Sequence, residues 1–190
     1  MKQNTRHAAL AAFAAVLAVF TAQAADEDLR NDAQQAISDF KRADSTLATF
    51  FDKAPGFAIF PNVGKGGLIV GGAHGKGLVY ATNTVIGQAT MTQASIGAQA
   101  GGQSFAEVIF FETPAALQDF KAGKFEMSAD VSAVAASEGA SQTAKYKNGV
   151  AVFALPKKGL MVQASVGGQK FKFEPVPLEP TGRPTEKKTN

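Results

Sequence analysis

Two kinds of side chain alternate along the stretch Gln93-Ala94-Ser95-Ile96-Gly97-Ala98-Gln99-Ala100-Gly101. One set is polar or small (Gln93, Ser95, Gly97, Gln99), and the other is apolar (Ala94, Ile96, Ala98, Ala100). Successive side chains of a β-strand point to opposite faces of a sheet, so this period of two predicts a strand with one polar face. We therefore expect the chain to be organised around a sheet.

Short apolar runs divided by glycine extend this pattern in both directions. They predict strands over 57–60, 66–72, 78–82, 88–101 and 105–111, and then over 129–136, 140–146, 149–155, 159–166 and 169–174. Pro61-Asn62 is expected to stop the first of these strands. Lys147-Asn148-Gly149 and Lys157-Lys158-Gly159 are expected to be turns, because Asn and Gly tolerate positive φ.

Two segments have the pattern of helices instead. Residues 26–53 carry apolar side chains at three- and four-residue spacing and predict one amphipathic helix, which Pro55-Gly56 ends. Its apolar stripe could pack on the core or insert at a membrane interface; we favour the core, since the first turn is acidic. Thr113-Pro114 is typical of an N-cap followed by Pro, so a second, short helix is expected from there to about Lys121.

These elements predict an α+β, β-dominated fold. We expect an antiparallel, Gly-rich sheet or barrel-like core, with an N-terminal amphipathic helix and a short central helix. The chain has 190 residues, of which 45% are hydrophobic and 18% charged, so one domain with a buried core is expected.

The first 24 residues have the pattern of a secretory signal peptide. Lys2 and Arg6 precede an apolar run, and Ala22-Gln23-Ala24 supplies a cleavage site. A retained membrane anchor is the alternative, but the apolar run is short for a span. We expect a domain over 25–174, a flexible Pro-rich tail over 175–190 and an exported protein. Loss of Lys2 and Arg6 would lower the net charge from +3 to about +1, which gives the whole domain no general attraction to nucleic acid or to an anionic membrane, so that only local patches could provide it.

The composition excludes several kinds of chemistry. The chain has no Cys, so it has no disulfide, thiolate nucleophile or Cys-based metal site. After signal removal His74 is the one histidine left, and no Gly-x-Ser-x-Gly motif presents a serine. An enzyme, a metal site and a cofactor are therefore not expected. The segment Gly71–Gly77 departs from a phosphate-binding P-loop and predicts a tight turn between two strands. Alternatively, it is an anion-contacting loop with Lys65, His74 and Lys76 beside it.

Several ordered motifs resemble those of the bacterial branch of the SYLF lipid-binding domain family. They are Gly56-Phe57-Ala58-Ile59-Phe60-Pro61-Asn62-Val63, Lys65-Gly66-Gly67, Gly71–Gly77, Thr92–Gly97, Gly101-Gly102-Gln103-Ser104, Ile109-Phe110-Phe111-Glu112 and Asn148–Phe153. The resemblance covers about residues 29–174. It implies a compact β-rich domain with packed helices, no enzymatic activity and no cofactor. By position, it also implies a lipid-contacting role for the helix expected over 26–53.

We therefore expect a periplasmic protein of a Gram-negative bacterium that contacts anionic phospholipid at the cell envelope. The alternative is a structural or protein-interaction module of the envelope without lipid affinity. The candidate lipid-binding residues are Lys41, Arg42, Lys53, Lys65, His74 and Lys76, because they are basic residues on apolar or Gly-rich elements. The expected partner is phospholipid, a membrane surface or an envelope protein, and not nucleic acid.

Overall fold

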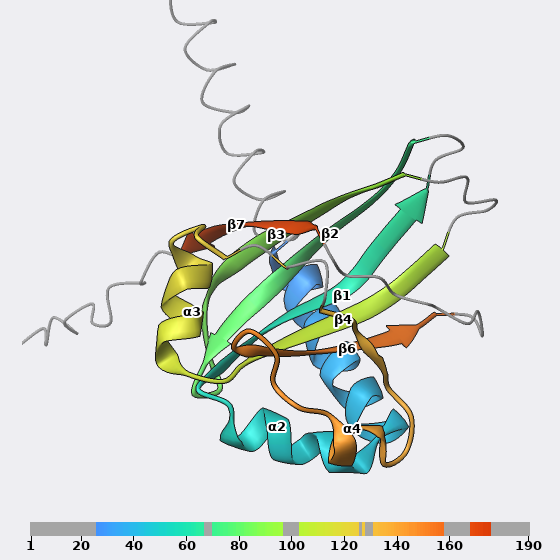
Figure 1. Ribbon diagram of the computed structural model, residues 1–190, viewed down its shortest axis with the longest axis vertical. Helices are drawn as coiled ribbons and strands as arrows, with labels where there is room; N and C mark the ends of the chain where they lie inside the picture. Colours follow the sequence, from blue (N-terminus) through green and yellow to red (C-terminus); the bar gives the residue numbers. More distant parts are fainter. Residues whose placement is uncertain are drawn as a thin grey trace, which may run out of the picture.

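A computed structural model describes residues 26–66, 70–96, 103–125, 127, 131–157 and 168–175 (Figure 1). The expected signal peptide, the tail after Pro175 and the expected strand over 159–166 lie outside the described residues. So does most of the turn expected at Lys157-Lys158-Gly159.

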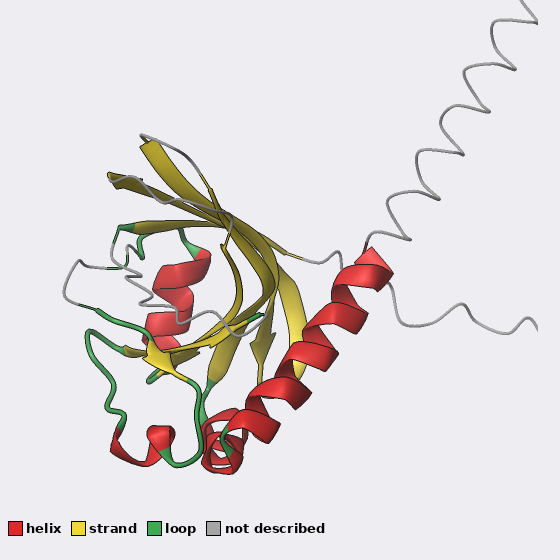
Figure 2. Cartoon of the chain, turned by 90° about the vertical axis from the view of Figure 1, so that its right-hand side faces the viewer, coloured by secondary structure: helices red, strands yellow, loops and turns green. Residues whose placement is uncertain are grey.

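Seven strands form one sheet in the order β5-β6-β4-β1-β2-β3-β7. Their bounds are β1 Gly56–Gly66, β2 Val70–Ala81, β3 Thr84–Ile96, β4 Gln103–Phe111, β5 Val134–Ala135, β6 Val150–Pro156 and β7 Gln169–Pro175. All neighbours are antiparallel except β5 and β6. The β-dominated fold class is thereby confirmed. The sheet curls strongly but stays open, with β5 and β7 as its two edge strands (Figure 2).

The glycine segment Gly71–Gly77 is not a turn, as the sequence predicted, but lies inside β2. The neighbouring β1 also differs from the prediction, because it continues through Pro61 with a register shift between Ile59 and Asn62. A bulge accommodates a proline, which has no N–H to donate to the ladder. At this bulge the two backbones approach closely: a Cβ on Gly77 would lie 2.3 Å from the carbonyl oxygen of Ile59. The glycine therefore serves close strand packing.

The predicted single helix over 26–53 is interrupted at Asp44. A helix over residues 26–43 ends there, and a 3₁₀ turn η1 (Ser45–Leu47) and helix α2 (Ala48–Lys53) follow. Asp44 is extended (φ −147°, ψ 103°), and its carboxylate accepts a hydrogen bond from the backbone N–H of Thr46. This is the geometry of a helix N-cap, which starts a new helix in a new direction.

Two strands predicted in the second half are largely absent. Where 129–136 was expected to be a strand, the described residues include only the two-residue β5. Where 140–146 was expected, a short helix α4 (Ala140–Thr143) forms after Gly139, whose φ is 77°. The carboxylate of Asp44 accepts hydrogen bonds from the backbone N–H groups of Gly139 (3.2 Å) and Ser141 (2.7 Å), which stabilises a helical turn there.

Two local predictions are confirmed. Helix α3 spans Pro114–Lys121, and the Thr113 hydroxyl accepts a hydrogen bond from the backbone N–H of Ala116. Asn148 and Gly149 have φ of 52° and 78°, which is the two-residue turn expected before β6.

Each face of the sheet carries its own apolar cluster. On the convex face, the helix of residues 26–43, η1 and α2 pack through Phe40, Leu47 and Phe51 against side chains of the sheet such as Leu78 and Phe110. On the concave face, α3 packs through Leu117 and Phe120 (Figure 2). The apolar stripe of the first helix therefore faces the core, as favoured from the sequence. In the part of the chain that the structure describes, no helix has the length and hydropathy needed to cross a membrane.

The interior also contains polar side chains that the sequence did not lead us to expect there. Gln93, placed on the polar face of its strand, is buried opposite Gln169 of β7. The side-chain amide of Gln169 donates a 3.0 Å hydrogen bond to the fully buried carboxylate of Glu107 on β4. Because β4 and β7 are separated by three strands in the sheet order, this contact crosses the concave interior.

Candidate functional site

The six basic candidates lie on four elements of the fold. Lys41 and Arg42 are on the helix of residues 26–43, and Lys53 ends α2. Lys65 lies on β1, where its backbone pairs with Ala73 and Gln103. His74 and Lys76 are exposed on β2. The structure therefore places His74 and Lys76 on one strand. The other candidates lie on other elements: Lys65 on β1, and Lys41, Arg42 and Lys53 on helices.

His74 and Lys76 begin two parallel rows of side chains that run across three strands. In one row His74 pairs with Thr92 of β3, and Thr92 pairs with Lys170 of β7. In the next row Lys76 pairs with Thr90, and Thr90 pairs with Lys172. Since neighbouring strands are about 4.8 Å apart, the ends of each row are about 10 Å apart at the backbone. We name these six residues the basic strand face: His74, Lys76, Thr90, Thr92, Lys170 and Lys172.

Period-two alternation keeps the whole basic strand face on the outside of the sheet. His74, Lys76, Lys170 and Lys172 are all exposed, whereas the intervening Gly75 and Phe171 are buried. The sequence reasoning missed Lys170 and Lys172. A signal was available, because in Lys170-Phe171-Lys172-Phe173 the cationic and aromatic residues alternate, which places both lysines on one face of a strand.

The first helix borders the basic strand face but does not cover it. Near the start of the helix, the side-chain amide of Gln88 donates a 2.7 Å hydrogen bond to Asp26, and that of Asn62 donates one of 2.7 Å to Asp32. Both acceptors are exposed carboxylates. Leu78 and Tyr80, further along β2, are buried in the cluster that the helix covers. One sheet face is thus divided into an apolar half under the helix and a polar, basic half.

Among the residues that the structure describes, one acidic side chain lies within the basic half. The Lys172 ammonium donates a hydrogen bond to the Glu174 carboxylate and forms an ion pair with it, at an N–O distance of 2.7 Å. The hydrogen bond and the attraction between the two charges raise the pKa of Lys172 and lower the pKa of Glu174. The charge of Lys76 lowers the pKa of Glu174 further. Both partners are exposed to solvent, so the pair contributes little to stability. It does reduce the positive charge that the face presents.

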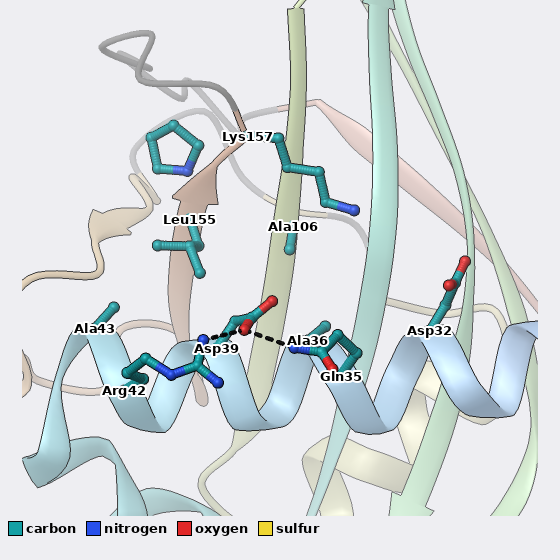
Figure 3. Close-up of a pocket in the computed structure, with 10 residues that line it drawn as sticks. Asp32, Gln35, Ala36, Asp39, Arg42, Ala43, Ala106, Leu155 and Lys157 are labelled. Atoms are coloured by element: carbon teal, nitrogen blue, oxygen red, sulfur yellow. Dashed lines mark hydrogen bonds and ion pairs between the residues drawn. The ribbon is translucent and has the colours of Figure 1, made fainter.

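Arg42 takes part in a different feature, a groove of about 580 Å³ between the first helix and the ends of β4 and β6 (Figure 3). Its guanidinium contacts the Asp39 carboxylate at 2.7 Å, and Gln35 donates to the same carboxylate at 2.9 Å. From the other side of the groove, Lys157 donates to the side-chain oxygen of Asn62. The charges around the groove are of both signs.

The other helical candidates have distinct surroundings. The Lys41 ammonium lies 5.1 Å from the centre of the Phe51 ring, a cation–π contact that holds it beside α2. Lys53 is exposed in the last turn of α2. Within the described ranges, no group of three or more His, Asp or Glu side chains is arranged to hold a metal ion.

Comparison with known proteins agrees with the motifs of the sequence. Residues 92–175 match the model of the Ysc84 family, described as Las17-binding protein actin regulator. The chain is also 36% identical over 124 residues to Beta cell expansion factor A of Aeromonas veronii. That match covers 64% of this chain and 46% of the relative, so the chain spans less than half the length of that protein.

The matched region contains half of the basic strand face. Residues 92–175 include Thr92 of β3 and both lysines of β7, whereas His74, Lys76 and Thr90 precede it. The expected family resemblance is thereby confirmed: residues 92–175 match the model of the Ysc84, or SYLF, family, and the relative belongs to the same family.

Proposed function

We propose that this protein is exported to the periplasm of a Gram-negative bacterium and there binds anionic phospholipid through the basic strand face. The Ysc84 family is a family of binding domains, and membership supports a lipid- or actin-related binding module. The observation that carries the proposal is the pair of cross-strand rows ending in Lys170 and Lys172. Lysine side chains attract phosphate groups, and threonine hydroxyls between them can donate hydrogen bonds to phosphate oxygens.

The shape of this surface supports contact with a membrane rather than with one enclosed ligand. Its side chains project from the outside of three adjacent strands, and all of them are exposed except Thr90, which is half-buried. A surface of this kind can meet several headgroups at once. The helix of residues 26–43 is less suited to insertion, because its apolar residues Ala33, Ala36 and Phe40 are already buried against the sheet.

Vesicle co-sedimentation tests the lipid-binding proposal. The mature protein should bind vesicles containing phosphatidylglycerol more strongly than vesicles of phosphatidylcholine alone, and salt should weaken binding. The double variant Lys170→Gln/Lys172→Gln should lose at least about tenfold in affinity, since each lysine near an anionic surface contributes roughly 1 kcal/mol. The matched control is Lys121→Gln/Lys124→Gln, at the end of α3 and just beyond it.

A third pair of substitutions tests the competing helical surface. If Lys41→Gln/Lys53→Gln weakens binding and the β7 pair does not, the first helix and α2 make the contact, and the basic strand face is not the site. If the wild type binds no vesicle of either composition, and crosslinking in cells captures one envelope protein, the alternative of a protein-interaction module is supported instead.

The expected location has its own test. Mass spectrometry of the protein from a periplasmic extract should find a mature chain that begins at Ala25. A full-length chain in the membrane fraction would support the retained anchor, and a full-length chain in the cytoplasm would contradict export.

A further inference from the structure

The groove between the first helix and the sheet is elongated. On the helix its lining residues recur at three- and four-residue spacing from Asp32 through Asp39 to Ala43, so they share one face. At a rise of about 1.5 Å per residue, this face is about 16 Å long. The opposite wall comes from the neighbouring ends of β4 and β6. The volume of about 580 Å³ falls within the range of roughly 300–1,000 Å³ typical of ligand pockets.

One end of the groove offers accessible apolar surface. Ala43 of the helix and Leu155 and Pro156 of β6 are half-buried, so part of each side chain is still open to solvent. Figure 3 shows Leu155 and Ala43 at the same end of the groove as Arg42, and Asp32 at the other end. An apolar group of a ligand can therefore be placed beside Arg42.

Charged side chains of opposite sign stand at the two ends. Asp32 accepts a 2.7 Å hydrogen bond from Asn62 through Oδ2, and its carboxylate has a second oxygen. Arg42, which is 71% exposed, gives one N–H to Asp39, and a guanidinium has five. Lys157 on the opposite wall donates to Asn62, and an ammonium has three donors. Two carboxylates and two cations line the groove, so a ligand with both signs of charge complements it better than a simple anion does.

We propose that this groove binds a short, extended peptide whose two ends are free. The amino group lies at Asp32, the terminal carboxylate lies at Arg42, and an apolar C-terminal side chain contacts Leu155. An extended chain advances about 3.3–3.6 Å per residue, so about four or five residues match the length of the helix face. Between the ends, the side chains of Gln35 and Lys157 can form hydrogen bonds with the peptide backbone.

The use of both termini distinguishes a free peptide from a segment of a protein, which has no two free ends to offer within 16 Å or so. The groove is also separate from the basic strand face, since its lining comes from the first helix, β4 and β6 with the residue that follows it. The proposal therefore does not depend on the proposed lipid surface.

Isothermal titration calorimetry on the mature protein tests the proposal, with the tetrapeptide Ala-Ala-Ala-Leu as the probe. Acetylating its amino end or amidating its carboxyl end should each weaken binding about tenfold, the scale of losing one charge-assisted hydrogen bond. Replacing its leucine with serine should also weaken binding, because the apolar contact is lost. The dipeptide Ala-Leu should bind more weakly, because it is too short to reach both ends. If the tetrapeptide does not bind, or binds equally well when both ends are capped, the proposal is wrong.

Two variants assign the ends of the peptide. Asp32→Asn should weaken binding of the free tetrapeptide about tenfold but leave the affinity for the acetylated peptide unchanged. Arg42→Gln should have the same effect on the free tetrapeptide but leave the affinity for the amidated peptide unchanged. The matched controls are Asp28→Asn and Arg30→Gln, which are exposed on the same helix outside the groove lining.

All four of these substitutions replace exposed side chains, so the variants should fold, and an unchanged urea midpoint checks this. If the controls weaken binding as much as the groove variants do, the peptide responds to the charge of the whole helix. If Arg42→Gln weakens binding of the amidated peptide as strongly as that of the free one, Arg42 does not bind the carboxylate. Either result would contradict the assigned site.

Discussion

The backbone N–H of Ser141 donates a 2.7 Å hydrogen bond to the buried carboxylate of Asp44, 97 residues earlier in the chain. The same carboxylate accepts bonds from the backbone N–H groups of Thr46 (3.0 Å) and Gly139 (3.2 Å). One side chain therefore ends the first helix, caps the turn that follows, and fixes the start of α4. This single residue explains two of the differences between the predicted and the observed elements.

Replacing Asp44 with Ala should destabilise the protein by about 2 kcal/mol or more, because buried N–H donors would lose their acceptor and a helix cap would be removed. The free energy of unfolding in urea measures the effect. Asp52→Ala is the matched control, since Asp52 is an exposed carboxylate on α2. Equal, small losses in the two variants would mean that the Asp44 hydrogen bonds contribute little net stability.

Acid should remove the contribution of Asp44. Burial alone raises the pKa of this carboxyl, but the hydrogen bonds from Thr46 and Ser141 outweigh burial and hold the pKa below its ordinary value of 3.8. The unfolded state therefore binds the proton more tightly than the folded state. The stabilisation is present above the ordinary pKa, which applies to the unfolded chain, and is lost as the pH falls through the lower folded pKa.

Urea unfolding of the wild type and of Asp44→Asn, from pH 7 down to about pH 2.5, isolates this group. The wild type should be more stable at neutral pH, and its advantage should shrink below about pH 4, the range set by an ordinary carboxyl. An advantage that stays constant to the lowest pH would show that the pKa of Asp44 is the same in both states.

Two glycines on adjacent strands should respond differently to the same substitution. A Cβ on Gly77 would lie 2.3 Å from the Ile59 carbonyl oxygen and 2.6 Å from a ring carbon of Phe60, whereas a Cβ on Gly64 would meet no atom within 4 Å. Gly77→Ala should therefore destabilise the protein by roughly 1–3 kcal/mol, the usual cost of overpacking. Gly64→Ala should be neutral or stabilise by up to about 1 kcal/mol, because alanine reduces the entropy of the unfolded chain. Thermal unfolding of both variants checks the pair, and equal effects would contradict the close approach at the bulge.

The sequence predicted those parts of the fold that depend on neighbours in the chain. Thr113-Pro114 caps α3, and Asn148-Gly149 turns the chain into β6, because both effects act within a few residues. The break at Asp44 and the helix α4 depend on a hydrogen bond across 97 positions, which no local pattern contains. The glycines of β2 were interpreted as a turn, because close approach to Ile59 arises only once the strands are paired.

The candidate surface was predicted in part, for a similar reason. His74 and Lys76 were chosen for their place in a Gly-rich segment, and they do share one surface. Lys170 and Lys172 join them only because β7 pairs with β3, although β3 and β7 are far apart in the chain. Arg42, chosen from the helix pattern, instead pairs with Asp39 beside a groove of mixed charge.

The ion pair between Lys172 and Glu174 predicts a variant with a gain of binding. Glu174→Gln removes a carboxylate that pairs with Lys172 and lies near Lys76, so the basic strand face becomes more positive. Affinity for vesicles containing phosphatidylglycerol should rise about fivefold, the scale of one elementary charge at such a surface. Stability should hardly change, because both partners are exposed. Asp119→Asn on α3 gives the same change in net charge away from this face. If both variants gained equally, the vesicle would respond to the charge of the whole protein, and the basic strand face would have no special part in binding.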